Sequence, residues 1–161
     1  MNRRALLALL LVLPAGLAHS QALKEATGPQ PTLAKEKLVI VTRDGRTLTF
    51  DVEMALTMQE QMTGLMFRTA MPPDSGMLFD WGSPRPSQMW MKNTLIPLDM
   101  VFINQDGTIR SIAENTVPRS LATIDSRGPV RATLELAGGT TAKQNIRVGD
   151  VVQQRIFGNE K

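Results

Sequence analysis

The stretch KLVIVTRDGRTLTFDVEM, residues 37–54, contains two β-strand patterns on either side of a turn. Lys37–Thr42 is rich in β-branched side chains, and Asp44–Gly45 is typical of a tight hairpin turn. From Thr47 to Met54, polar and apolar residues alternate, which is the period of a strand with one buried and one solvated face. This stretch therefore predicts a β-hairpin.

The rest of the chain repeats these signals at short intervals. Thr57-x-x-Glu60 forms a capping box, which predicts one short helix ending near Leu65, and 140–145 is compatible with a single helical turn. Further short strands are predicted at 76–80, 88–92, 98–104, 108–115, 129–137 and 151–157. Such a series predicts a mainly β fold, either an antiparallel sandwich of jelly-roll-like type or a partly closed barrel, with one short helix.

Residues 1–22 have the three-part organisation of a secretory signal peptide. Two arginines precede the apolar run Ala5–Leu13, and small residues mark two cleavage positions, after Ser20 and after Ala22. The apolar stretch is shorter than the ~20 residues that a membrane-spanning helix needs. We therefore expect a periplasmic or secreted protein with no stable membrane insertion after cleavage.

Two further segments follow the signal peptide. Residues 23–35 contain Gly28, Pro29 and Pro31, which is typical of a linker without a core of its own. Residues 36–158 are expected to form a single β domain, because about 120 residues are enough to bury one hydrophobic core.

The composition excludes several classes of chemistry. The 161 residues include no Cys and no Tyr, and the single His, His19, lies in the signal peptide. Residues 23–161 therefore cannot provide Ser-His-Asp or Cys-His catalysis, nor a His-ligated metal site. They carry 16 basic and 15 acidic residues, a net charge of +1, and no long basic run, so nucleic-acid binding is not expected.

The densest mixture of polar and apolar residues lies between Trp90 and Asp99. Trp90 offers an aromatic face, while Asn93 and Thr94 can fix hydrogen bonds at a strand end. Asp99 opens a strand that is apolar on both faces, so its carboxylate needs a partner, with Lys92 and Arg68 as candidates. A ligand-binding site of Arg68, Trp90, Asn93, Thr94 and Asp99 is one interpretation, and a buried ion pair with a structural loop is the other.

Methionine is concentrated in one part of the chain, with nine of ten residues between positions 54 and 100. Thioethers are soft ligands that suit Cu(I), and they also pack well into irregular cores. The alternative to core packing is a Cu(I) site drawn from Met58, Met62, Met66, Met89 and Met91.

Paired carboxylates are the remaining route to catalysis. Asp51, Asp99, Glu114 and Glu135 could supply an acid and a base, as in glycoside hydrolysis, but the sequence does not bring two of them together. Glu135 shares the more polar face of its strand with Arg131, which predicts a surface ion pair. No catalytic residue is assigned.

The chain resembles the family called domain of unknown function 192 over residues 50–158. The resemblance rests on blocks of sequence in a fixed order: GLMFR at 64–68, GMLF at 76–79, WMKNTLIPLD at 90–99, LEL at 134–136 and GD at 149–150. It implies a compact, mainly β domain, often exported or membrane-tethered, and it implies no enzyme activity. Many members carry Cys after the motif matched by Val117–Pro118, where this chain has Arg119–Ser120–Leu121.

Taken together, the residues and the resemblance predict an exported, non-catalytic module without a cofactor, which binds a small ligand or a component of the cell envelope. Met-based Cu(I) binding and a carboxylate hydrolase acting on envelope carbohydrate are the alternatives.

Overall fold

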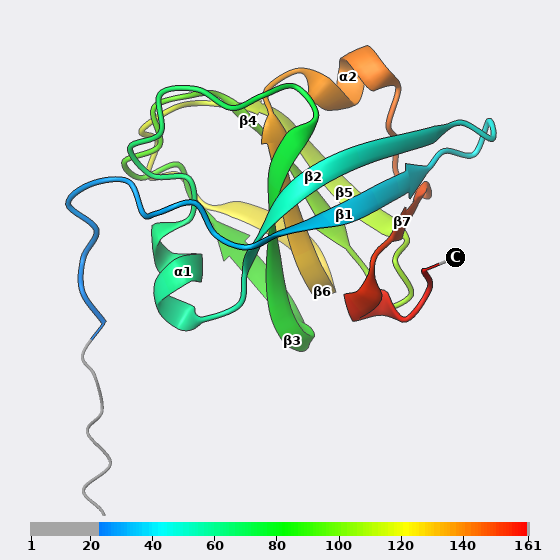
Figure 1. Cartoon of the computed structure of the whole chain (residues 1–161), viewed down its shortest axis with the longest axis horizontal. Coiled ribbons are helices and arrows are strands. Elements are labelled where there is room, and N and C mark those ends of the chain that lie inside the picture. Colours follow the sequence, from blue (N-terminus) through cyan, green and yellow to red (C-terminus); the bar gives the residue numbers. More distant parts are fainter. Residues whose placement is uncertain (1–22, 161) are drawn as a thin grey trace, which may run out of the picture.

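The computed structural model describes residues 23–160, so the predicted signal peptide lies outside the described residues. Seven strands form one sheet in the order β5-β4-β6-β3-β2-β1-β7, and the sheet curls into a half-barrel (Figure 1). The strands are β1 (Lys35–Val41), β2 (Thr47–Ala55), β3 (Ser75–Met89), β4 (Leu98–Ile103), β5 (Ile109–Thr116), β6 (Ile124–Ala137) and β7 (Val151–Gln153). The mainly β fold is confirmed.

The hairpin of residues 37–54 is also confirmed, with β1 and β2 antiparallel and Val41 opposite Thr47. One pair differs from the antiparallel expectation, because β2 and β3 run parallel, with Asp51 opposite Ser75. Between the two strands the chain forms helix α1 (Met58–Thr63) and a long loop. This loop returns toward the end of the sheet at which β2 begins. Such a crossover connection is what allows two consecutive strands to be parallel.

The two edge strands of the sheet meet at one end. Thr108, just before β5, forms a bridge with Val151 of β7. The Ile109 amide donates to the Asp150 carbonyl at 2.8 Å, and the Val152 amide donates to the Gly107 carbonyl at 2.8 Å. The sheet is therefore closed at this end, as in the partly closed barrel that the sequence predicts.

The predicted capping box is present at the start of α1. The Glu60 amide donates to the Thr57 hydroxyl at 3.3 Å, and the Thr57 amide donates to the Glu60 carboxylate at 2.8 Å. The helix ends at Gly64, whose φ of 49° is accessible to glycine at little cost. A second short helix, α2 (Thr140–Gln144), confirms the helical turn expected there. No helix within residues 23–160 has the length and apolarity needed to cross a bilayer.

Several predicted strands have different bounds in the structure. The strand predicted at 129–137 begins earlier, at Ile124, and the strand predicted at 76–80 is the first part of the long β3. The strand predicted at 88–92 ends at Met89, as the last part of the long β3, whose register shifts on both sides of Arg85. The strand predicted at 151–157 stops after Gln153 and continues as the 3-10 helix η1 (Arg155–Phe157), because the Gln154 side chain accepts a hydrogen bond from the Ile156 amide at 2.9 Å.

Hydrophobic clusters cover both faces of the sheet, and β6 lies between β3 and β4 at its centre. All residues from Val130 to Leu136 are therefore buried, including Arg131 and Glu135. The prediction of a surface ion pair between these two was wrong: Arg131 instead pairs with Asp80 on β3. The polar side chains of β6 face one of these two hydrophobic clusters, not solvent.

Candidate functional site

A cavity of about 290 Å³ lies beside α1, over β3 and β6. The Gln61 side chain holds α1 against the sheet by donating to the carbonyls of Ala55 at 3.2 Å and Asp80 at 2.7 Å. The cavity is lined by Met58, Gln61, Met62, Thr63, Gly64, Leu65, Met66, Phe79, Trp81, Arg85, Gln88, Met89, Trp90, Thr94 and Glu135. Most of this lining is apolar or aromatic, which is typical of a small-molecule site.

The mouth of the cavity is formed by apolar side chains that reach solvent. Met58, Met62 and Trp90 are 63%, 45% and 51% exposed. Apolar side chains gathered on the surface in this way are typical of a place where another molecule binds.

A second cavity, of about 270 Å³, adjoins the first and shares Met62, Thr63, Met66 and Trp90 with it. Its other wall is the segment that precedes β1, where the Gln59 side chain accepts from the Lys24 amide at 3.0 Å and donates to the Lys24 carbonyl at 2.9 Å. Figure 1 shows this segment running beside α1. The residues assigned to a linker thus border the site.

Glu135 is the one acidic side chain that lines the first cavity. It lies on β6 between Met77 of β3 and Met100 of β4, and it is 4% exposed. Burial raises the pKa of this carboxyl from its ordinary 4.5 to about 8, and no hydrogen bond or charge from residues 23–160 lowers it. A carboxyl group without an internal partner therefore faces the cavity.

Three of the five predicted site residues lie at these cavities. Trp90 and Thr94 line the first, and Trp90 and Asn93 line the second. Asn93 adopts a φ of 56°, and its carbonyl accepts from the Phe67 amide at 2.8 Å, which fixes the loop after β3. The Lys92 ammonium lies 5.6 Å from the centre of the Trp90 ring.

The other two predicted site residues lie away from the cavities. Arg68 donates to both carboxylate oxygens of Glu53, at 2.6 and 2.8 Å, in a largely buried pair. Asp99 is completely buried and accepts from the backbone amides of Asn115, Gly139 and Thr141. Neither Lys92 nor Arg68 is its partner, contrary to expectation, because the end of β5 and the start of α2 supply backbone donors instead.

We expect Arg68→Met to lower the free energy of unfolding by about 2 kcal/mol, because Glu53 would keep a buried charge without its partner. Urea denaturation measures the loss. Adding Glu53→Gln in the same chain should recover part of it, since the double variant buries no charge. A single variant as stable as wild type would contradict the structural role of the pair.

Four of the five methionines considered for Cu(I) line the first cavity: Met58, Met62, Met66 and Met89. Met91 is fully buried, and its sulfur accepts from the Thr116 hydroxyl at 3.1 Å. Core packing thus describes Met91 and the buried Met66, but not Met58 and Met62, which lie on α1 and are exposed.

The acids considered for hydrolysis are not gathered in this cavity. Glu135 lines it, while Asp99 lies in the core and Asp51 and Glu114 are exposed. A single carboxyl group does not supply the acid and base that glycoside hydrolysis requires.

Four lining residues of β3 were not predicted as site residues: Phe79, Trp81, Arg85 and Gln88. The Phe79 and Trp81 rings stack with their centres 5.7 Å apart, and the Arg85 guanidinium lies 4.5 Å from the centre of the Trp81 ring. The Trp81 indole donates to the Thr133 hydroxyl at 3.2 Å. Phe79 belongs to the GMLF block at 76–79, but no motif marks the other positions, since the bends of β3 decide which side chains reach the cavity.

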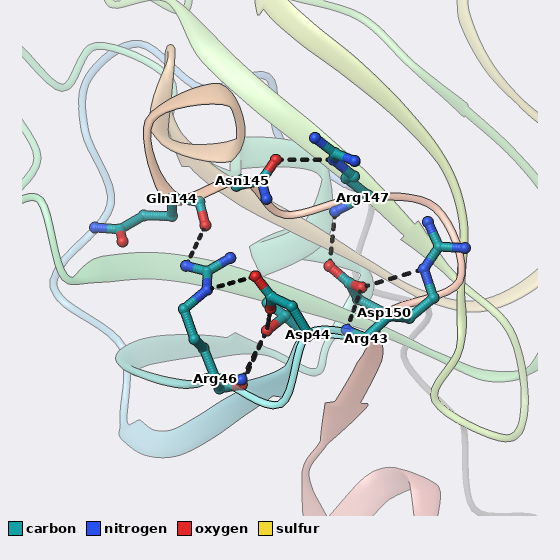
Figure 2. Close-up of polar contacts among 8 residues, drawn as sticks. Arg43, Asp44, Arg46, Gln144, Asn145, Arg147 and Asp150 are labelled. Carbon is teal, nitrogen blue, oxygen red and sulfur yellow. Dashed lines mark hydrogen bonds and ion pairs between the residues drawn. The ribbon is translucent and has the colours of Figure 1, made fainter.

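A second polar cluster, with Arg43, Arg46 and Arg147, joins the β1–β2 turn to the segment after α2 (Figure 2). The Arg46 guanidinium donates to the Gln144 carbonyl at 2.8 Å, and Asp150 accepts from the backbone amides of Arg43 and Arg147. Asp44 and Asp150 lie among the arginines, so much of the positive charge is compensated within the cluster. We interpret this cluster as a structural contact that holds the β1–β2 turn against the segment after α2.

Comparison with known proteins places this chain in a family. The family model of domain of unknown function 192, described as an uncharacterized ACR, matches residues 39–154. The chain belongs to this family, as the sequence resemblance indicates. Among curated proteins, none matches the chain.

Two solved structures are similar to this chain. A candidate transcription regulator from Sinorhizobium meliloti 1021 is 49% identical, with a TM-score of 0.77, and the match covers 79% of this chain and 98% of that one. A protein of unknown function from Novosphingobium aromaticivorans DSM 12444 is 35% identical, with a TM-score of 0.74, and the match covers 82% of this chain and 95% of that one.

Proposed function

We propose that this chain is a non-catalytic binding module whose first cavity holds a small organic ligand. The observation that carries the proposal is the mouth of the cavity, where Met58, Met62 and Trp90 expose apolar surface to solvent around a lining of further apolar side chains. Exposed apolar surface is unfavourable in water, and a ligand with an apolar body would cover it. The volume suits a ligand near the lower end of the usual size range.

The test uses 2-phenylethanol, a small neutral aromatic alcohol, titrated into the protein and followed by the indole N–H signals of Trp81 and Trp90. We expect both signals to shift, and Trp90→Ala to weaken binding about three- to tenfold, because an aromatic contact contributes roughly 0.5–1.5 kcal/mol.

Val117→Ala is the matched control, because Val117 is 68% exposed and lies outside the cavity lining. It should bind the alcohol as wild type does. Equal weakening by both substitutions, or no shift of either indole signal, would contradict the proposal.

Cu(I) binding is the second candidate, because four thioethers line one cavity. The double variant Met58→Leu and Met62→Leu removes two sulfurs and keeps apolar volume at the mouth. If the ligand is Cu(I), this variant should lose stoichiometric copper in metal analysis and still bind 2-phenylethanol. Wild-type protein without stoichiometric copper would contradict this candidate.

We also propose that the module acts outside the cytoplasm. The support is the signal-like pattern of residues 1–22, with its arginines, apolar run and small residues. Cell fractionation with mass measurement should find a periplasmic or secreted form that begins after Ser20 or Ala22. Residues 23–161 carry a net charge of only +1, which does not favour binding to the phosphate backbone of nucleic acid.

A further inference from the structure

We propose that the ligand of the first cavity is an organic cation, an ammonium group on an apolar body, and that Glu135 recognises its charge. This inference rests on the proposed function, since it names the chemical class of the ligand in the same cavity. It is carried by the position of one carboxyl group among aromatic and thioether side chains.

The Glu135 carboxyl is a buried acid that has no hydrogen-bond or ion-pair partner among residues 23–160. It lines the cavity and is 4% exposed, and no hydrogen bond or charge from residues 23–160 stabilises its ionised form. Burying an unpaired carboxylate is costly, so the empty site favours the neutral acid. An ammonium group that enters the cavity would supply the missing counter-charge and a charge-assisted hydrogen bond.

The charged groups of the elements around Glu135 have other roles. Glu60 of α1 caps its own helix, Asp80 of β3 pairs with Arg131 of β6, and Asp99 of β4 accepts its backbone donors. Arg85 is the only other ionisable side chain of the lining, and it is exposed and stacked on Trp81. None of them neutralises Glu135.

The remaining lining suits a cation with an apolar body. The aromatic side chains of Phe79, Trp81 and Trp90 supply apolar contact area, and the methionine thioethers are polarisable, although Arg85 and Lys92 already lie over the Trp81 and Trp90 rings. The cavity of about 290 Å³ is much larger than a single metal ion requires, which favours an organic cation over Cu(I).

The test compares three probes of similar shape: phenethylammonium, neutral 2-phenylethanol and anionic 3-phenylpropionate. For wild-type protein we expect the ammonium to bind at least about tenfold more tightly than the alcohol, and the anion to bind most weakly. In Glu135→Gln, binding of the ammonium should fall to within about threefold of the alcohol, whose own affinity should not change.

Glu114→Gln is the matched control, because Glu114 is an exposed acid outside the cavity lining. It should keep the full preference for the ammonium. An independent measurement on wild type locates the charge: NOEs should join the methylene beside the ammonium to the Glu135 side chain. This measurement decides the question even if Glu135→Gln does not fold.

The outcomes separate the two proposals. If none of the probes binds in the cavity, the proposed function fails. If the alcohol binds but the ammonium binds no better, or the anion binds best, the proposed function stands and the cation inference is overturned. NOEs that place the phenyl ring, rather than the ammonium, beside Glu135 would also overturn it.

Discussion

Asp99→Ala is expected to lower the free energy of unfolding by roughly 3–5 kcal/mol, the largest effect of any substitution considered for this protein. Asp99 is completely buried and accepts from the amides of Asn115 and Thr141 at 2.8 Å and of Gly139 at 2.9 Å. The Thr141 hydroxyl lies 2.8 Å from the same carboxylate. Alanine would leave these donors buried without an acceptor, and each such loss is costly.

The Asp99 carboxylate also caps the N-terminus of α2, which has no side-chain cap of its own. The residue that precedes the helix is Gly139, which has no side chain to cap it, and Asp99 of β4 accepts the Gly139 and Thr141 amides instead. In hydrogen exchange, Asp99→Ala should therefore lose protection first at α2 and at the end of β5.

Urea denaturation measures the stability, and Glu114→Ala serves as the control. Glu114 lies 3.1 Å from the same Thr141 hydroxyl but is exposed, so its loss should cost less than about 1 kcal/mol. If both substitutions cost equally little, the assigned role of Asp99 would be contradicted.

The second large effect is on the pH dependence of stability. The Glu135 carboxyl has a pKa of about 8 in the folded protein, against an ordinary value of 4.5, because it is buried. Between these values the folded state binds more protons than the unfolded state, so stability falls as pH rises. The contribution is fully present below about pH 4.5 and is lost by about pH 8, with a total of roughly 3–5 kcal/mol.

The measurement compares wild type with Glu135→Gln in urea at several pH values across this window. Residues 23–161 contain no His, so no other side chain of ordinary pKa titrates between pH 5 and 8. The glutamine variant should give a nearly flat curve, while wild type should lose stability steadily. Parallel curves would show that Glu135 is not the responsible group.

Local patterns predicted the elements that depend on neighbours in sequence. The hairpin of residues 37–54 and the capping box of Thr57 and Glu60 are both present, because turn geometry and helix caps are determined within a few residues. The series of short strand patterns separated by turns predicted the mainly β class, and the family resemblance implied the same class. The parallel pairing of β2 with β3 depends on the path of the chain between them, which no local pattern reports.

The site was predicted less completely, for a related reason. Trp90, Asn93 and Thr94 lie at the cavities, and their loop is rich in polar residues that the sequence shows directly. Glu135 was assigned to the surface because it alternates with apolar residues on β6, although both faces of that strand are covered. Its burial follows from the central place of β6 in the sheet, which is a property of the whole fold.

The contact between the edge strands has a consequence for self-association. Strands at the margin of a sheet present unpaired backbone groups that can recruit another chain and start aggregation. Here the Thr108–Val151 bridge pairs backbone groups of the two edge strands at one end of the sheet. The edge strand β7 is itself only three residues long, Val151–Gln153. The β7 margin therefore leaves little backbone for strand addition between molecules, whereas β5, with eight residues, keeps a longer edge beyond the bridge. The protein thus exposes apolar side chains at Met58, Met62 and Trp90 on a sheet in which β5, not β7, is the margin where another chain could add.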